Sequence, residues 1–113
     1  MLHLLTPEQQ KEAYDRFVYE SGRAAFEIGF WLFDGKKATR VDERKIACPV
    51  LVIAGAEDRI TPASVVRKVH EKYGARSTFR ELSGHAHWVV GEPGWGDVTE
   101  LIRAWLDRNI EGA

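Results

Sequence analysis

The feature that most constrains the fold is a short apolar run, Val-Leu-Val-Ile-Ala-Gly, at residues 50–55. The run is rich in β-branched residues, follows Pro49 and is closed by Gly55. A continuous apolar run of this length is typical of a strand that is buried on both faces, as in a parallel sheet. Parallel strands need a crossover connection, which is most often a helix. The run therefore predicts an α/β fold.

The following residues supply the expected crossover and a second strand. Thr61-Pro62 predicts a helix start, with Thr as the N-cap and Pro at the first helical position, and Gly74 predicts its end. Residues 77–82 predict a strand, and residues 95–109 predict a final helix. This order predicts two parallel strands. The side chains expected to face inward are Val65, Val66, Val69 and Tyr73 on the first helix and Val98, Leu101, Ile102, Trp105 and Leu106 on the second.

The first part of the chain predicts helices between residues 6 and 33. Thr6-Pro7 has the same start signal, while Gly22 and Gly29 weaken the pattern enough to predict a break or two helices. Residues 36–45 are rich in charge and predict a surface connection. We divide the chain into residues 1–45 and residues 46–113, which together are expected to form one compact domain. One group of aromatic side chains is denser than a small helix normally buries: Phe26, Phe30, Trp31 and Phe33.

Composition and charge exclude several classes of function. The chain has 113 residues and a net charge of -1, from 16 Lys and Arg and 17 Asp and Glu, so no nucleic-acid or membrane-surface partner is expected. No apolar run approaches the roughly 18 residues of a membrane span. Cys48 is the only cysteine, which excludes an internal disulfide and a cysteine-ligated zinc site and predicts a cytoplasmic protein.

Acidic and histidine residues follow the two expected strands. Ligands of open parallel sheets bind beyond the carboxyl ends of the strands, where the first strand leads to Asp58 and the second to His85. An acid and a histidine should therefore emerge side by side, as two members of a Ser-His-Asp triad. Glu57 is the alternative acid, and Asp58 can also be interpreted as a simple turn residue.

A second histidine, His87, allows other interpretations of the loop that follows the second expected strand. His87 is interpreted as a structural or pocket-lining residue. A metal site at His85 and His87 would need further ligands, for which Asp58 and Glu92 are conceivable. We predict neither a metal nor a cofactor.

Several spaced segments resemble one known family. Residues 49–62, followed by Ser83-Gly84-His85 and Glu92-Pro93-Gly94, resemble the C-terminal portion of α/β-hydrolase-fold proteins, over about residues 46–106. In that family the penultimate strand commonly ends in Gly-x-x-Asp and the last strand leads to Gly-His before a terminal helix. The resemblance implies a partial α/β-hydrolase fold, with Asp58 as triad acid, His85 as triad base and residues 1–45 as the end of a cap region.

The nucleophile of that family has no counterpart in this sequence. The Gly-x-Ser-x-Gly elbow is absent, and Cys48 lies before the first strand, on the order of 20 Å from Asp58. We therefore expect a truncated hydrolase relative that would cleave ester-type small molecules only with a nucleophile from outside the chain. The alternative is a non-catalytic interaction or binding module. Because two strands leave both sheet edges open, either protein is expected to self-associate, most simply as a homodimer.

Overall fold

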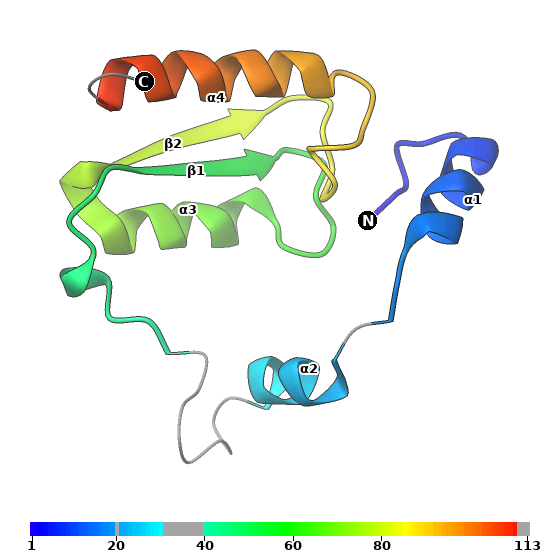
Figure 1. Ribbon diagram of the computed structural model, residues 1–113, viewed down its shortest axis with the longest axis horizontal. Coiled ribbons are helices and arrows are strands. Elements are labelled where there is room, and N and C mark those ends of the chain that lie inside the picture. Colours follow the sequence, from blue (N-terminus) through cyan, green and yellow to red (C-terminus); the bar gives the residue numbers. More distant parts are fainter. Residues whose placement is uncertain (20, 31–39, 111–113) are drawn as a thin grey trace.

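The computed structural model describes residues 1–19, 21–30 and 40–110 of the chain. Figure 1 shows two helices in the first part of the chain, followed by a strand-helix-strand-helix unit that contains the sheet. Expectations for residues 31–39, which include Trp31 and Phe33, lie outside the described residues. The elements in chain order are α1 (Pro7–Arg16), α2 (Gly22–Gly29), the short 3-10 helix η2 (Glu43–Lys45), β1 (Val50–Gly55), α3 (Ala63–Tyr73), the 3-10 turn η3 (Gly74–Arg76), β2 (Ser77–Leu82) and α4 (Trp95–Asn109).

The sheet in the described part of the chain consists of β1 and β2, which pair in parallel. Val50 is opposite Ser77 at one end of the register, and Gly55 is opposite Leu82 at the other. Helix α3 connects the strands and lies on one side of them, while α4 lies on the other (Figure 1). The predicted small α/β architecture, with two parallel strands and flanking helices, is confirmed.

The core lies on both faces of the sheet. Val52 pairs with Phe79, whose ring lies against His70 of α3. Val52 and Ala54 therefore face α3, whereas α4 covers the opposite face. Val52 and Ala54 of β1 are buried, as are Val98 and Trp105 of α4. The indole Nε1 of Trp105 also donates a hydrogen bond of 3.1 Å to the hydroxyl of Thr78 on β2. The predicted apolar stripe of α4 is confirmed, because its remaining members, Leu101, Ile102 and Leu106, are half-buried.

The two expected Thr-Pro helix starts differ in the structure. At α1 the prediction is confirmed: the Gln9 amide donates to the Thr6 hydroxyl, and the Thr6 amide donates to the Gln9 side chain, which forms a capping box. At α3 the prediction is wrong. Pro62 occupies the N-cap without a side-chain cap, because the Thr61 hydroxyl donates to Asp58 instead.

The apolar side chains of α3 are less buried than expected. Val66 and Tyr73 are half-buried, but Val65 and Val69 are exposed, so the prediction that both face a core is wrong. A sheet of two strands is too narrow to cover the whole apolar stripe of the helix. In α2, likewise, no residue is buried.

Within the residues that the structure describes, no helix is both long enough and apolar enough to cross a bilayer.

Gly55 allows the ends of β1 and β2 to approach each other. A Cβ at this position would lie 2.6 Å from the carbonyl oxygen of His85 and closer still to that of Ala86. We therefore predict that Gly55→Ala lowers the free energy of unfolding by roughly 1–3 kcal/mol, because backbone atoms must move apart. Gly96→Ala is the matched control, since a Cβ there meets no atom within 4 Å. Urea denaturation of both variants checks this, and equal stabilities would contradict it.

Candidate active site

Asp58 lies in the turn that follows β1, and its carboxylate is fixed by the backbone beyond it. Its Oδ1 accepts hydrogen bonds from the amides of Ile60, at 2.8 Å, and Thr61, at 3.0 Å. Its Oδ2 accepts the Thr61 hydroxyl at 2.9 Å. Aspartate favours such turns because its side chain can bond to amides a few residues further on. The side chain is only 6% exposed, so the carboxylate has one defined orientation.

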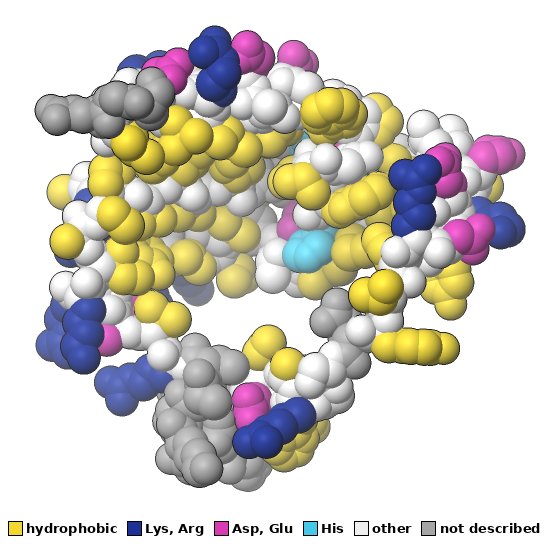
Figure 2. Space-filling model, in the orientation of Figure 1, with side chains coloured by type: hydrophobic (Ala, Val, Ile, Leu, Met, Phe, Trp, Pro, Cys, Tyr) yellow, Lys and Arg dark blue, Asp and Glu magenta, His cyan; other side chains and the backbone are white. Residues whose placement is uncertain are grey.

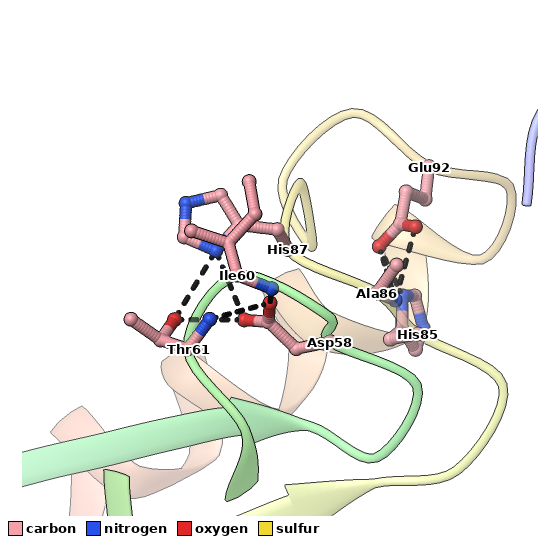
Figure 3. Close-up of polar contacts among 7 residues, drawn as sticks. All are labelled: Asp58, Ile60, Thr61, His85, Ala86, His87 and Glu92. Atoms are coloured by element: carbon pink, nitrogen blue, oxygen red, sulfur yellow. Dashed lines mark hydrogen bonds and ion pairs between the residues drawn. The ribbon is translucent and has the colours of Figure 1, made fainter. Parts of the chain in front are cut away.

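His87 reaches the same carboxylate from the loop after β2. Its Nδ1 lies 2.9 Å from Asp58 Oδ2 and 3.2 Å from the Thr61 hydroxyl oxygen. Figure 3 shows the ring with Nδ1 turned toward Asp58 and the other nitrogen, Nε2, turned away from it. The side chain is 35% exposed, which leaves one side of the imidazole accessible to a ligand.

The ionisation of Asp58 determines the tautomer of His87. Burial raises the pKa of the Asp58 carboxyl, but hydrogen bonds from His87, from the amides of Thr61 and Ile60 and from the Thr61 hydroxyl together lower this pKa to about 2. At neutral pH the carboxylate is therefore ionised and can only accept hydrogen bonds. The proton between the two residues must then lie on His87 Nδ1, which leaves a lone pair on Nε2 of the neutral ring.

His85 does not lie beside Asp58, and the expected contact between them is not formed. The His85 side chain is only 11% exposed and turns toward Glu92 (Figure 3). Its Nδ1 lies 3.5 Å from Glu92 Oε1 and has no hydrogen-bond partner among the described residues. The cause is the turn after β2: Gly84 has a φ of 75°, and the His85 carbonyl accepts the Glu57 amide. Side-chain directions along β2 therefore do not continue into the loop.

Glu92 holds this loop in place from inside. It is 1% exposed, and both of its carboxylate oxygens accept the amide of Ala86, at 2.9 and 3.0 Å. Ala86 lies between the two histidines, so Glu92 fixes the backbone that presents His87. The sequence suggested Glu92 only as a conceivable metal ligand, and no local pattern distinguishes a buried acid from a solvated one.

The two histidines do not converge on a common metal position. His87 bonds to Asp58, whereas His85 lies against Glu92 on the other side of the loop (Figure 3). Over residues 1–19, 21–30 and 40–110, no group of three or more His, Cys, Asp or Glu side chains could hold a metal ion.

Potential nucleophiles lie elsewhere or are already engaged. Cys48 is exposed and precedes β1, at the opposite end of the strand from Asp58. The Ser77 hydroxyl lies 2.8 Å from Nδ1 of His70, at the start of β2. His70 is thus half-buried and bonded. The Ser21 hydroxyl accepts the Ala24 amide at the start of α2.

A pocket of about 360 Å³ lies between α1 and the loop that leads to α4. The ring of Phe17 contacts that of Trp88 edge-on across this region, with 6.1 Å between the centroids. Because Trp88 directly follows His87, a ligand in this pocket would touch the loop that carries the histidine. The residues that line the pocket are Leu5, Gln9, Glu12, Ala13, Arg16, Trp88, Gly91, Pro93 and Trp95.

Comparison with protein-family models, with curated proteins and with solved structures finds no match for this chain. Any argument about function must therefore start from the geometry around Asp58 and His87.

The low pKa of Asp58 predicts a pH-dependent contribution to stability. A carboxyl that titrates at about 2 when folded and near 3.8 when unfolded stabilises the fold above about pH 4. This contribution is lost as the pH falls through 2. After allowance for solvent screening at the loop, we expect Asp58→Asn to be less stable than wild type by about 1 kcal/mol at pH 6. Urea denaturation between pH 2 and 7 should show this difference shrinking toward pH 2, and a pH-independent difference would contradict the assignment.

Burial of Glu92 predicts that its removal destabilises the loop. Glu92→Ala leaves the buried amide of Ala86 without its acceptor, so we expect a loss of about 1–3 kcal/mol in the free energy of unfolding. Glu100→Ala is the control: that side chain is 65% exposed and pairs with Arg103 on the surface, where such a pair contributes less than about 1 kcal/mol. Thermal and urea denaturation compare the two variants, and similar losses would contradict the structural role of Glu92.

Proposed function

We propose that Asp58 and His87 are the acid and the base of a hydrolytic site of the α/β-hydrolase type that cleaves ester or similar acyl bonds. The observation that carries this proposal is the 2.9 Å contact between Asp58 Oδ2 and His87 Nδ1 at the carboxyl ends of two parallel strands. An ionised, firmly held carboxylate on one imidazole nitrogen leaves the other nitrogen free to act as a base.

The resemblance to α/β-hydrolases supports the same type of site with one change of residue. By sequence, His85 after Gly84 was the expected base, and Asp58 the expected acid. The geometry favours His87 as the base, since His85 is buried against Glu92 and makes no contact with Asp58. The membership of the chain in that family remains part of this proposal.

Each proposed residue has a defined step in the reaction. Nε2 of His87 takes the proton of an attacking hydroxyl, whose oxygen forms a bond with the acyl carbon. Asp58 stabilises the imidazolium that results. The imidazolium then gives its proton to the departing alkoxide as the acyl–oxygen bond breaks. The net reaction converts an ester and water into a carboxylic acid and an alcohol.

The attacking hydroxyl comes from outside the chain in this proposal. Thr61 is the one hydroxyl recorded within hydrogen-bond distance of His87 in the described residues, and it lies on the Nδ1 side, where it donates to Asp58. The nucleophile is then a water molecule.

A second candidate function is a non-catalytic interaction module. It is favoured by the unburied apolar side chains of α2, which a free enzyme would have no reason to expose. The two candidates differ in whether the intact protein turns over an ester.

Hydrolysis of p-nitrophenyl acetate distinguishes the two candidates. We expect the wild-type chain to hydrolyse this ester faster than free imidazole does. The variants His87→Gln and Asp58→Asn should each lower kcat/KM by about 100-fold or more. His70→Gln is the matched control and should retain activity, because His70 lies on α3 beside Ser77, at the end of β2 far from the site. Circular dichroism confirms that each variant is folded.

Two results would overturn parts of this assignment. If His85→Gln abolished activity in a folded protein while His87→Gln did not, the base would be His85. If the wild-type chain showed no turnover above free imidazole, the catalytic proposal would fail and the interaction module would stand.

A further inference from the structure

One side of the molecule, which we call the open side, carries apolar side chains from two helices. It consists of Phe26, Ile28 and Phe30 at α2 together with Val65 and Val69 of α3, all classed as exposed. A groove of about 660 Å³ joins the two helices, with Ile28 on one wall and Val69 and Tyr73 on the other. Figure 2 shows the opening between α2 and the rest of the chain, with hydrophobic side chains above it.

Helix α2 cannot be stable in this exposed position by itself. It has eight residues and buries none of them, and isolated helices shorter than about 12–15 residues are marginal in water. The Ser21 cap stabilises the helix by about 1 kcal/mol, and the Arg23–Glu27 ion pair by less than about 0.5 kcal/mol. The apolar face of α2 therefore needs a surface that covers it.

The sheet has the same deficiency. Within the described residues, β1 pairs on one edge alone, so its other edge has no partner strand. Two-stranded sheets need further packing to be stable, and an unpaired edge invites association.

The exposed area indicates how large the missing contact is. The chain exposes 8625 Å², whereas a monomer of 12.8 kDa should expose about 6,300 Å². The radius of gyration is 16.3 Å, against about 13 Å for a folded domain of this length. The excess of about 2,300 Å² is an upper limit for the contact, because side chains outside the open side, such as Tyr14 and Tyr19, also contribute to it. Each partner of an obligate homodimer buries about 1,000–2,500 Å².

We propose that a second copy of this chain covers the open side, with α2 of each copy packed against α2 and α3 of the other. A two-fold axis places the same surface on both partners, so a self-complementary surface is sufficient. Each chain provides both parts of the contact: an unpacked apolar helix, and a groove in which apolar side chains lie beside charges of both signs, those of Arg40, Asp42, Glu43, Arg44 and Lys72. The net charge of -1 per chain gives little repulsion between copies. This interface does not depend on the proposed catalytic function.

The mass in solution tests the proposal. Light scattering at micromolar concentration should give twice 12.8 kDa for the wild-type chain. Ile28→Lys should raise the dissociation constant by about 30-fold or more, because it places a charge in the centre of the interface. Since Ile28 is 67% exposed in the single chain, the substitution should not disturb the fold itself. Val90→Lys is the matched control, at a side chain that is 68% exposed but lies outside the open side, and should remain dimeric.

Hydrogen exchange provides an independent measurement. The amides of α2 should exchange rapidly at concentrations where the chain is monomeric and become protected as the dimer forms. A folded monomer at micromolar concentration would overturn the proposal, including a monomer that associates only with a different polypeptide. A dimer that Ile28→Lys does not weaken would overturn the assigned interface.

Discussion

The parallel pairing of β1 and β2 continues beyond the strands, and the whole candidate site depends on this continuation. The amide of Ala56 donates to the carbonyl of Leu82, and the amide of Glu57 donates to the carbonyl of His85. This approach requires a residue without a side chain at position 55, where any Cβ would meet the opposite backbone. These backbone hydrogen bonds hold the loop after β1 against the loop after β2, and the two loops carry Asp58 and His87.

Two carboxylates then perform different tasks within a few residues of each other. Asp58 is held by amides of its own turn and directs one oxygen to His87, so it orients a side chain. Glu92 is more deeply buried and accepts the Ala86 amide with both oxygens, so it orients backbone. The position of His87 thus rests on one contact to its ring and one to its loop. His85, between these two anchors, fills the interior of the loop.

The narrow sheet explains most of the apolar exposure in the molecule. Two strands cover Val66 of α3 but not Val65 or Val69, and they leave nothing for α2 to pack against. On the opposite face, α4 buries Val98 and Trp105, whose indole is bonded to Thr78, while the rest of its stripe is half-buried. Neither face of the two-stranded sheet therefore covers the whole apolar stripe of the helix that lies on it.

The sequence alone determined the elements and their order, because those depend on local patterns. The apolar run ending at Gly55 and the helix end at Gly74 were predicted close to their observed bounds, and so was the position of Asp58 after β1. Periodicity and turn residues act over a few positions, which is why a single sequence contains them.

The tertiary structure decided which histidine meets the acid. His85 and His87 are two residues apart, and no local pattern separates them. The left-handed turn at Gly84 and the bond between Glu57 and His85 rotate the loop so that His87 faces Asp58. The burial of Glu92 and the exposure of Val69 were decided in the same way, since both depend on contacts between segments far apart in the chain.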